Sequence, residues 1–452
     1  MGVVSLLVSG ASAQGPLAER ARRYLAEMTR LDTSNPPGRE TRMAAYLERV
    51  AREEGIPSEL LGRDPSRLNF VARLGGSGEA RPLLLMAHTD VVPAEAAQWS
   101  VPPFSAEIRA GFLYGRGSVD DKSLLAAELA TLVELKRSGR PLRRDVILAA
   151  EADEEGGSDG MRWLVRNAWT KIDAEFALTE GGFATDLPSG IRVYQIQTAE
   201  KVPMPVLVRA RGSAGHGSLP RPDNPVVNVS RALVKLADAD QPARLNATTR
   251  RYLAELAKLP DYAWLAPLLP RLEREQTAIP AANEIRRRNA ELNAQVRTTV
   301  SPDVLRGGSV TNVIPTLAEA LVDVRRLPNE TSEEVLARLR EIVHDNQVEI
   351  LPAPGPDAPV CAPSSVSTAL YRTMETVLRS ATPGARVIPY MQRGATDGRF
   401  LRQKGMAVYG APLFAIDDRD NHAHGNDERI SVAGFETGVQ LLWKIVTGVA
   451  GR

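Results

Sequence analysis

Histidine and carboxylate side chains recur in loops that directly follow short apolar segments. They are His88, Asp90, Asp120, Glu154, Glu155 and Glu180. If the apolar segments are neighbouring parallel strands, their carboxyl ends open on one edge of a sheet, and these groups converge there. Five carboxylates this close cannot all stay ionised, because like charges raise one another's pKa. The pattern therefore predicts a site for one or two divalent metal ions.

The elements that must position these groups alternate between helix and strand. Apolar runs predict strands at residues 68–74, 83–86, 112–114, 144–150 and 175–178. Helical spacing of apolar residues predicts helices at 16–30, 40–54 and 123–137. Strands that alternate with helices indicate an α/β fold with a mostly parallel sheet, covered by helices on both faces.

The pattern changes after residue 190 and predicts an inserted, smaller α/β lid domain. Strands are expected within 194–211, 298–315, 318–325 and 347–351, and helices at 228–237, within 248–293 and at 331–343. The proline-rich stretch Pro352–Pro356 marks the return to the first domain. We therefore expect a catalytic domain formed by residues 15–190 and 353–452, with the lid at 191–352.

Composition narrows the chemistry. The chain has 56 Lys and Arg residues and 55 Asp and Glu residues, so its charges nearly cancel. This balance does not favour binding to a nucleic acid. Cys361 is the only cysteine, so any metal must be held by nitrogen and oxygen. Residues 1–14 contain a short apolar run and Ala11-Ser12-Ala13, a pattern typical of a signal-peptidase site. We expect export to the periplasm or secretion, with a cytoplasmic location as the alternative, and no membrane span.

Five separated motifs together resemble one enzyme family. The motifs are HTD (88–90), GRGSVDDK (115–122), DEEGGS (153–158), TEGG (179–182) and HGNDERI (424–430). In this order they resemble the co-catalytic zinc exopeptidases that include aminoacylase, acetylornithine deacetylase, carnosinase and carboxypeptidase S. The similarity extends from Asn35 to Glu428. Glu180, the long helical insertion in the lid and the loop Gly394–Arg399 resemble most the branch of carboxypeptidase S and N-acyl amino acid hydrolases.

The resemblance implies a role for each residue of the catalytic domain. Two zinc ions, for which Co²⁺ or Mn²⁺ can substitute, would be bridged by Asp120. His88 and Glu180 would complete one zinc site, and Glu155 and His424 the other, with His422 as the competitor of His424. Asp90 would hydrogen-bond His88 and fix its tautomer. Glu154 would be the general base. The family pattern also implies a cis peptide bond between Asp120 and Asp121.

The lid matches the same family. The resemblance implies that His216 reaches the active site of a partner subunit and stabilises the oxyanion, which requires a homodimer formed through the lid. Asn312 and Arg325 match positions that bind the carboxylate of the substrate, although Arg325 could instead form a plain strand ion pair with Asp323. Gly394 and Thr396 are further candidates for substrate binding.

The expected enzyme is a metallopeptidase or amidohydrolase that cleaves an amide bond next to a free α-carboxylate, in a peptide or an N-acyl amino acid. Two alternatives belong to other classes. Gly156–Gly160 satisfies the G-x-S-x-G pattern of serine hydrolases. However, the acidic stretch before Ser158 is unfavourable beside an oxyanion hole, and Ser158 fits better as the N-cap of the next helix. A non-catalytic binding protein with this fold would be expected to lack ligands or the base.

Overall fold

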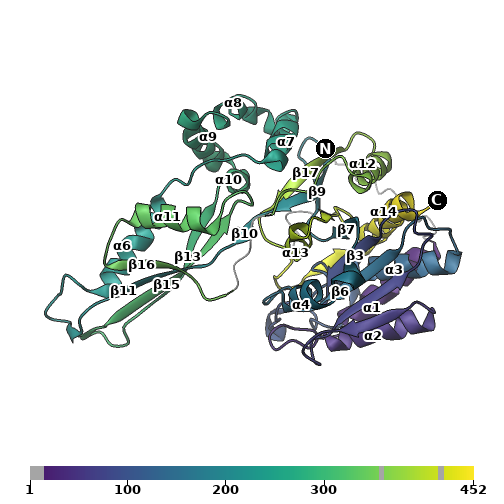
Figure 1. Cartoon of the computed structure of the whole chain (residues 1–452), viewed down its shortest axis with the longest axis horizontal. Coiled ribbons are helices and arrows are strands. Elements are labelled where there is room, and N and C mark those ends of the chain that lie inside the picture. The colour runs from purple at the N-terminus through teal and green to yellow at the C-terminus, as the bar shows by residue number, and fades with distance from the viewer. Residues whose placement is uncertain (1–14, 356–360, 416–421) are drawn as a thin grey trace, which may run out of the picture. The chain divides into compact units, whose positions relative to one another are not determined.

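The computed structural model describes residues 15–355, 361–415 and 422–452 and divides into two compact units (Figure 1). Unit 1 comprises the described residues of Met1–Gln195, Val366–Val387 and Met406–Arg452, and unit 2 those of Ile196–Ser365 and Ile388–Gly405. The signal-like residues 1–14 and Pro356 lie outside the described residues. None of the described helices is long and apolar enough to cross a membrane.

Unit 1 is built on the largest sheet among the described residues, and two strands of this sheet, β9 and β17, continue into unit 2. Its strand order is β1 (Ser58–Leu61), β2 (Asn69–Leu74), β6 (Val146–Glu151), β3 (Leu83–His88), β7 (Phe176–Thr179), β18 (Ala407–Gly410), β9 (Arg192–Glu200) and β17 (Arg386–Gln392), with β8 (Phe183–Asp186) paired to β9. β6, β3, β7 and β18 are parallel to one another, which confirms the predicted α/β class with a mostly parallel sheet. Every residue of β3 and β6 is buried. Burial on both faces of the sheet explains why apolar residues follow one another without alternation along most of each strand.

Helices pack on this sheet and on one another. They are α1 (Pro16–Thr29), α2 (Thr41–Glu53), α3 (Lys122–Ser138), α4 (Asp159–Asn167), α5 (Trp169–Ile172), α12 (Ala369–Ala381) and α14 (Val432–Ala450). α3 packs against β3 and β6, and α1 and α14 pack against α3. A small sheet of β19 (Arg429–Ser431), β5 (Phe112–Tyr114) and β4 (Ile108–Arg109) joins the loop after β5 to the segment that contains His424.

Unit 2 has a five-stranded antiparallel sheet covered by two helices. The sheet order is β10 (Val202–Pro203), β15 (Leu317–Arg326), β11 (Val206–Arg211) and β16 (Val348–Pro352), and β13 (Thr299–Gly307) also pairs with β15. α6 (Pro225–Asp238) and α11 (Ser332–Val343) pack on each other and on the sheet (Figure 1). Thr331 and Glu334 form a capping box at the start of α11, in the segment predicted as a helix.

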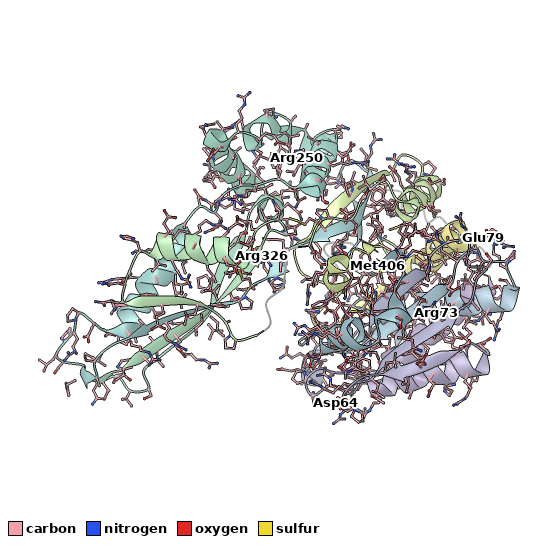
Figure 2. All side chains as sticks on the ribbon, in the orientation of Figure 1. Asp64, Arg73, Glu79, Arg250, Arg326 and Met406 are labelled. Carbon is pink, nitrogen blue, oxygen red and sulfur yellow. The ribbon has the colours of Figure 1, made fainter. Side chains whose placement is uncertain are left out.

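The remaining helices of unit 2 come from the expected helical insertion. They are α7 (Ala247–Leu256), η2 (Pro260–Leu265), α8 (Leu269–Leu272), α9 (Glu275–Arg288) and α10 (Ala290–Val296). Arg250 of α7 forms an ion pair with Glu273 at 2.7 Å. Arg326, at the end of β15, is a buried arginine of the same unit (both arginines are labelled in Figure 2). Gln295 of α10 donates to the carbonyl of Met391 at 2.8 Å, which ties the insertion to β17.

The unit boundaries differ from the expected domain boundaries in three places: residues 191–195 belong to unit 1, whereas the described residues of 353–365 and residues 388–405 belong to unit 2. For residues 388–405 the physical reason is a buried cluster around Glu200. Its carboxylate binds Arg402 of α13 (Gly398–Gln403) at 2.5 Å and accepts from the amide and hydroxyl of Thr396 at 2.5 and 2.9 Å. Both charged partners are almost fully buried, so these contacts attach the loop that contains Thr396 to the end of β9.

Candidate metal centre

Adjacent strand ends bring the predicted ligands together in unit 1. His88 is the last residue of β3, while Glu154 and Glu155 follow β6 and Glu180 follows β7. Potential ligand atoms of His88, Glu154 and Glu180 lie within 4.8 Å of one another, and so do those of His88, Asp120 and Glu155. The two groups share His88, so these four carboxylates converge on one edge of the sheet.

Asp120 lies between two imidazoles. Its Oδ1 is 2.8 Å from Nε2 of His88, and its Oδ2 is 3.2 Å from Nε2 of His424. The same nitrogen of His424 is 2.9 Å from Oε1 of Glu155. Asp120 therefore contacts both imidazoles of the predicted ligand set. His422 makes a different contact, from Nδ1 to the carbonyl of Asn426 at 2.8 Å.

The electrostatics of the cluster fit a divalent cation. Burial opposes protonation of His88, but Asp120 and Asp90 outweigh it and hold its pKa well above the ordinary value. Asp120 and Glu155 raise the pKa of His424 to about 10. Burial, together with the charges of Glu154 and Asp120, raises the pKa of Glu180. Imidazole nitrogen and carboxylate oxygen are ligands that zinc accepts, and a bound cation would relieve this excess of acidic groups.

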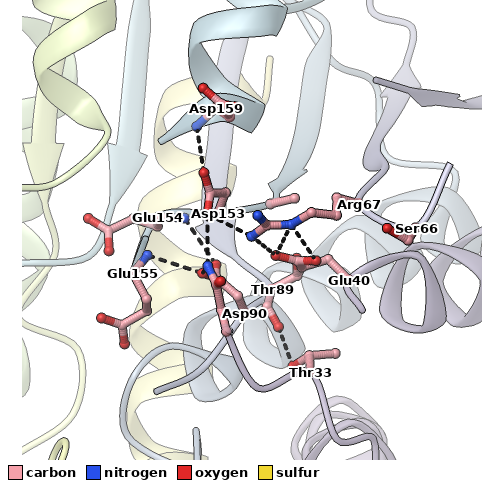
Figure 3. A network of polar contacts seen from close by, with 12 residues as sticks. Thr33, Glu40, Ser66, Arg67, Thr89, Asp90, Asp153, Glu154, Glu155 and Asp159 are labelled. Atoms are coloured by element: carbon pink, nitrogen blue, oxygen red, sulfur yellow. Dashed lines mark hydrogen bonds and ion pairs between the residues drawn. The ribbon is translucent and has the colours of Figure 1, made fainter. Parts of the chain in front are cut away.

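Asp90 organises the backbone beside the cluster (Figure 3). Its carboxylate accepts from the amides of Glu154 and Glu155, both at 3.1 Å, and from Asn35 at 2.8 Å. Nδ1 of His88 is 3.0 Å from the carbonyl oxygen of Asp90 but 3.6 Å from the carboxylate. The contact expected between the Asp90 side chain and His88 is thus long, and the carboxylate is used mainly to hold the following acidic loop.

The loop of Asp120 is held by Glu428, a buried residue whose importance the HGNDERI motif alone does not reveal. Its carboxylate accepts from the amides of Gly117, Val119 and Asp120 at 2.8–3.1 Å and from Arg116 at 2.6 Å. Arg116 also donates to the carbonyls of His424 and Gly425, so one ion pair positions both Asp120 and His424. The predicted cis peptide bond between Asp120 and Asp121 is confirmed.

The lid residues belong to unit 2. His216 lies in the short strand β12 (Gly215–His216), which pairs with β14 (Val313–Ile314) next to Asn312. The side chains of His216 and Asn312 are exposed, and the amide of Gly217 donates to the Asn312 carbonyl at 2.8 Å. Nδ1 of His216 lies 2.7 Å from the hydroxyl of Ser218. The structure therefore brings these two predicted residues together on one ribbon.

Two other predicted site residues that lie in unit 2 make internal contacts. Nε of Arg325 binds both carboxylate oxygens of Asp323 at 2.9 Å, which is the strand ion pair considered as the alternative. Thr396 is 1% exposed and bound by Glu200, so its hydroxyl already has a partner within unit 2. Gly394 is half-buried, and a Cβ added there would meet open space.

Ser158 is poorly placed for a nucleophile. It directly precedes α4, as expected of an N-cap, but its side chain makes no capping hydrogen bond. The residue is only 2% exposed, and its amide donates to the carbonyl of Asp153 at 2.5 Å. His424 is engaged with Asp120 and Glu155 instead. This geometry disfavours the serine hydrolase alternative.

Comparison with known proteins defines the class. Residues 84–447 match the model of the peptidase family M20/M25/M40, so the chain belongs to this family and is a hydrolytic enzyme of the metallopeptidase and amidohydrolase type. It is 29% identical over 379 residues to human N-fatty-acyl-amino acid synthase/hydrolase PM20D1, covering 82% of this chain and 75% of that protein.

Solved structures share the fold. The M20 family metallo-carboxypeptidase Sso-CP2 from Sulfolobus solfataricus superposes with a TM-score of 0.72 and 21% identity, covering 94% of this chain and 98% of the other. The YXEP protein of Bacillus subtilis, described as a dinuclear metal binding peptidase from the M20 family, gives a TM-score of 0.59 at 14% identity, covering 95% of this chain and 97% of the other.

Proposed function

We propose that the chain hydrolyses an amide bond whose nitrogen belongs to an amino acid with a free α-carboxylate. The observation that carries the proposal is the convergence of two imidazoles and four carboxylates at one sheet edge, with Glu154 among them. The similarity to a protein named an N-fatty-acyl-amino acid synthase/hydrolase favours N-acyl amino acids as substrates, and dipeptides are the second candidate.

The donor set suits two divalent ions, and zinc is the preferred candidate. His88, Asp120 and Glu180 would hold one ion, and Asp120, Glu155 and His424 the other. Metal ions bound there would lower the pKa of a water molecule and polarise the carbonyl oxygen of the substrate. Asp90 and Glu428 hold the backbone of the ligand-bearing loops through hydrogen bonds to their amides.

Glu154 is the proposed general base. Its carboxylate lies within 4.8 Å of the ligand atoms of His88 and Glu180, and its amide is fixed by Asp90. In hydrolysis Glu154 takes a proton from the attacking water as the C–O bond forms. It then delivers this proton to the amide nitrogen as the C–N bond breaks, which releases the amino acid and a carboxylic acid.

Residues of unit 2 are proposed to bind and polarise the substrate. His216, supplied by a partner subunit, would donate to the oxyanion of the tetrahedral intermediate. Asn312 and Arg325 would bind the α-carboxylate, since the contact of Arg325 with Asp323 uses Nε and a guanidinium offers further donors. Gly394 would leave room for the substrate, whereas the hydrogen bonds of Thr396 suit a role in positioning this loop.

A homodimer through unit 2 is part of the proposal. Large apolar side chains exposed on this unit are Leu219, Val227, Val234, Val304, Leu305, Val310, Val313 and Leu321. In the part of the chain that is described, β13 pairs with one strand, β15. Exposed apolar surface at a sheet edge is typical of an interface between protein chains. We also propose export, which rests on the short apolar run and the Ala11-Ser12-Ala13 pattern within residues 1–14.

The test combines metal analysis with product release. Purified protein is analysed by elemental mass spectrometry and assayed for amino acid release from N-acyl amino acids and dipeptides, before and after treatment with a chelator. About two metal ions per chain and release that the chelator abolishes would support the proposal. Metal-free protein with undiminished release would refute it. The relative rates on the two substrate panels decide between acyl and peptide substrates.

A further inference from the structure

The acidic loop after β6 is anchored by the residue that begins it, Asp153. Its carboxylate accepts from Asn35 at 2.8 Å, from Arg67 at 2.6 Å and from the amide of Asp159 at 3.1 Å. Its carbonyl accepts from the amides of Gly157 and Ser158. Asp153 therefore fixes both ends of the segment that contains Glu154 and Glu155.

Arg67 supplies the positive charge for Asp153. Its guanidinium also binds Glu40 through three contacts of 2.6–3.2 Å, and Glu40 is completely buried. A Cβ at Gly38, where φ is +81°, would overlap this guanidinium, so the turn after Asn35 must present a glycine to it. Arg67 is thus clamped between Glu40 and Asp153.

The network continues from Asp153 to Asp90. The side-chain amide of Asn35 donates to both carboxylates at 2.8 Å, and Asp90 in turn accepts from the amides of Glu154 and Glu155. Carboxylate oxygens of Glu40, Asp90 and Asp153 lie within 4.8 Å of one another. Figure 3 shows Arg67 on one side of Asp153 and the carboxyl groups of Glu154 and Glu155 directed to the other side.

We propose that Arg67 is a positioning residue for the general base: by pairing with both Asp153 and Glu40 it holds the acidic loop so that Glu154 can reach the attacking water. The inference rests on the proposed function, in which Glu154 is the base. Without the guanidinium, buried acids would face one another without a cation, and the loop would have to move to separate or hydrate them.

The expected effect falls on turnover and not on substrate binding. A displacement of about 1 Å in a catalytic group can cost on the order of 100-fold in rate, so Arg67→Ala should lower kcat by roughly 10- to 100-fold. Arg67 contacts Glu40 and Asp153, which are not among the residues proposed to bind the substrate. KM should therefore stay within about threefold of wild type. Arg67→Lys should be intermediate, since an ammonium cannot bind both carboxylates as a guanidinium does.

A cavity allows the guanidinium to be replaced chemically. A cavity of ≈ 600 Å³ is lined by Arg67, Asp153 and Arg63. Guanidinium chloride at a non-denaturing concentration should therefore restore part of the kcat lost in Arg67→Ala, whereas sodium chloride should not. Arg63→Ala is the matched control, because Arg63 lines the same cavity but its mostly exposed side chain binds only the surface residue Asp159 among the contacts described. This control should keep wild-type kcat.

Two further arms keep the test decisive. The double variant Glu40→Gln/Arg67→Met removes both charges of the buried pair, so it should fold even if Arg67→Ala does not, and should show the same loss of kcat. Metal content is measured in each variant. The proposal is overturned if Arg67→Ala or the double variant folds and keeps wild-type kcat, or if the loss of kcat is explained by a loss of bound metal. It is also overturned if guanidinium restores none of the kcat of Arg67→Ala. Wild-type protein without chelator-sensitive hydrolysis would instead refute the proposed function itself.

Discussion

Three consecutive acids, Asp153, Glu154 and Glu155, have different surroundings although they share one loop. Asp153 is buried and bound to Arg67, whereas Glu155 faces His424 and Glu154 lies near His88 and Glu180. Local environment, and not residue type, therefore separates an anchoring residue, a proposed ligand and a proposed base.

The distinction between Glu154 and Glu155 can be tested directly. Glu154→Gln keeps the size of the side chain but removes the proton acceptor, so kcat should fall by about 10²- to 10⁴-fold while metal content stays near wild type. Steady-state kinetics and elemental analysis measure the two quantities. If the variant loses metal along with activity, Glu154 is a ligand and not the base.

Glu155→Gln serves as the comparison for that experiment. Glu155 contacts His424 at 2.9 Å in the proposed second metal site. Its amide replacement should therefore lower metal content as well as activity, because a neutral amide is a weaker ligand than a carboxylate. Equal metal content in the two variants would remove the proposed distinction.

The raised pKa values predict how metal binding depends on pH. Without metal, the carboxylates around His88 and His424 raise the pKa of both imidazoles, that of His424 to about 10. Both rings are therefore doubly protonated and positively charged at neutral pH. In the metal-free protein the His424 contribution to stability is complete below its ordinary pKa of 6.5 and is lost as pH rises through about 10. Metal must displace these protons, so metal affinity should rise with pH over this range.

Calorimetry can measure this displacement. Zinc is titrated into chelator-treated protein at neutral pH in two buffers with different ionisation enthalpies, and the difference in heat gives the number of protons released. We expect roughly two, one from each imidazole, with a further contribution from Glu180 because its pKa is also raised. Identical heats in the two buffers would contradict the predicted protonation of the histidines.

At the scale of elements, the sequence predicted the strands that carry the site. β3, β6 and β7 are short apolar runs, and each is followed by residues that cannot continue a buried strand. Parallel pairing then requires their ends to meet, which is why the sequence pattern alone could group His88, Glu154, Glu155 and Glu180.

The parts of the fold and site that the sequence could not predict depend on long-range contacts. The sequence pattern yields no predicted element at β17 or α14, and the expected catalytic domain includes residues 388–405, which group with unit 2. Arg67 and Asn35 resemble ordinary loop residues, since nothing local indicates that Asp153 and Asp90 lie beside them. A weak signal exists in Gly156, because a Cβ there would overlap Asp153 and Asn35.

The buried pair of Glu200 and Arg402 predicts a measurable effect on unit 2. Glu200→Gln leaves the buried guanidinium without its counter-charge and should lower the free energy of unfolding by about 3–5 kcal/mol. Urea unfolding monitored by circular dichroism measures the change. Glu349→Gln is the matched control, since its contact with Arg209 is 3.9 Å long and half-exposed, and its cost should be about 0–1 kcal/mol.

At the scale of the whole molecule, the proposed roles divide between the two units. The imidazoles and carboxylates of the metal centre belong to unit 1, whereas His216, Asn312, Arg325 and Gly394 belong to unit 2. The chain passes between the units within β9, within β17, and at residues 365/366 and 405/406. β17 leads directly to the loop anchored by Glu200. If unit 2 also forms the dimer, each subunit can contribute to a second active site without a change in its own metal centre.

Mixing two inactive variants tests this shared site. In a heterodimer of Glu154→Gln and His216→Ala chains, the His216→Ala chain keeps an intact Glu154 and can receive His216 from its partner. Random exchange makes about half of the dimers mixed, each with one complete site of two, so activity should recover to about a quarter of wild type. If His216 acts in its own subunit, every site in the mixture lacks one of the two groups and no activity returns. If instead His216 has no role at the oxyanion, the His216→Ala variant is active before mixing, and exchange with Glu154→Gln chains adds nothing to that activity.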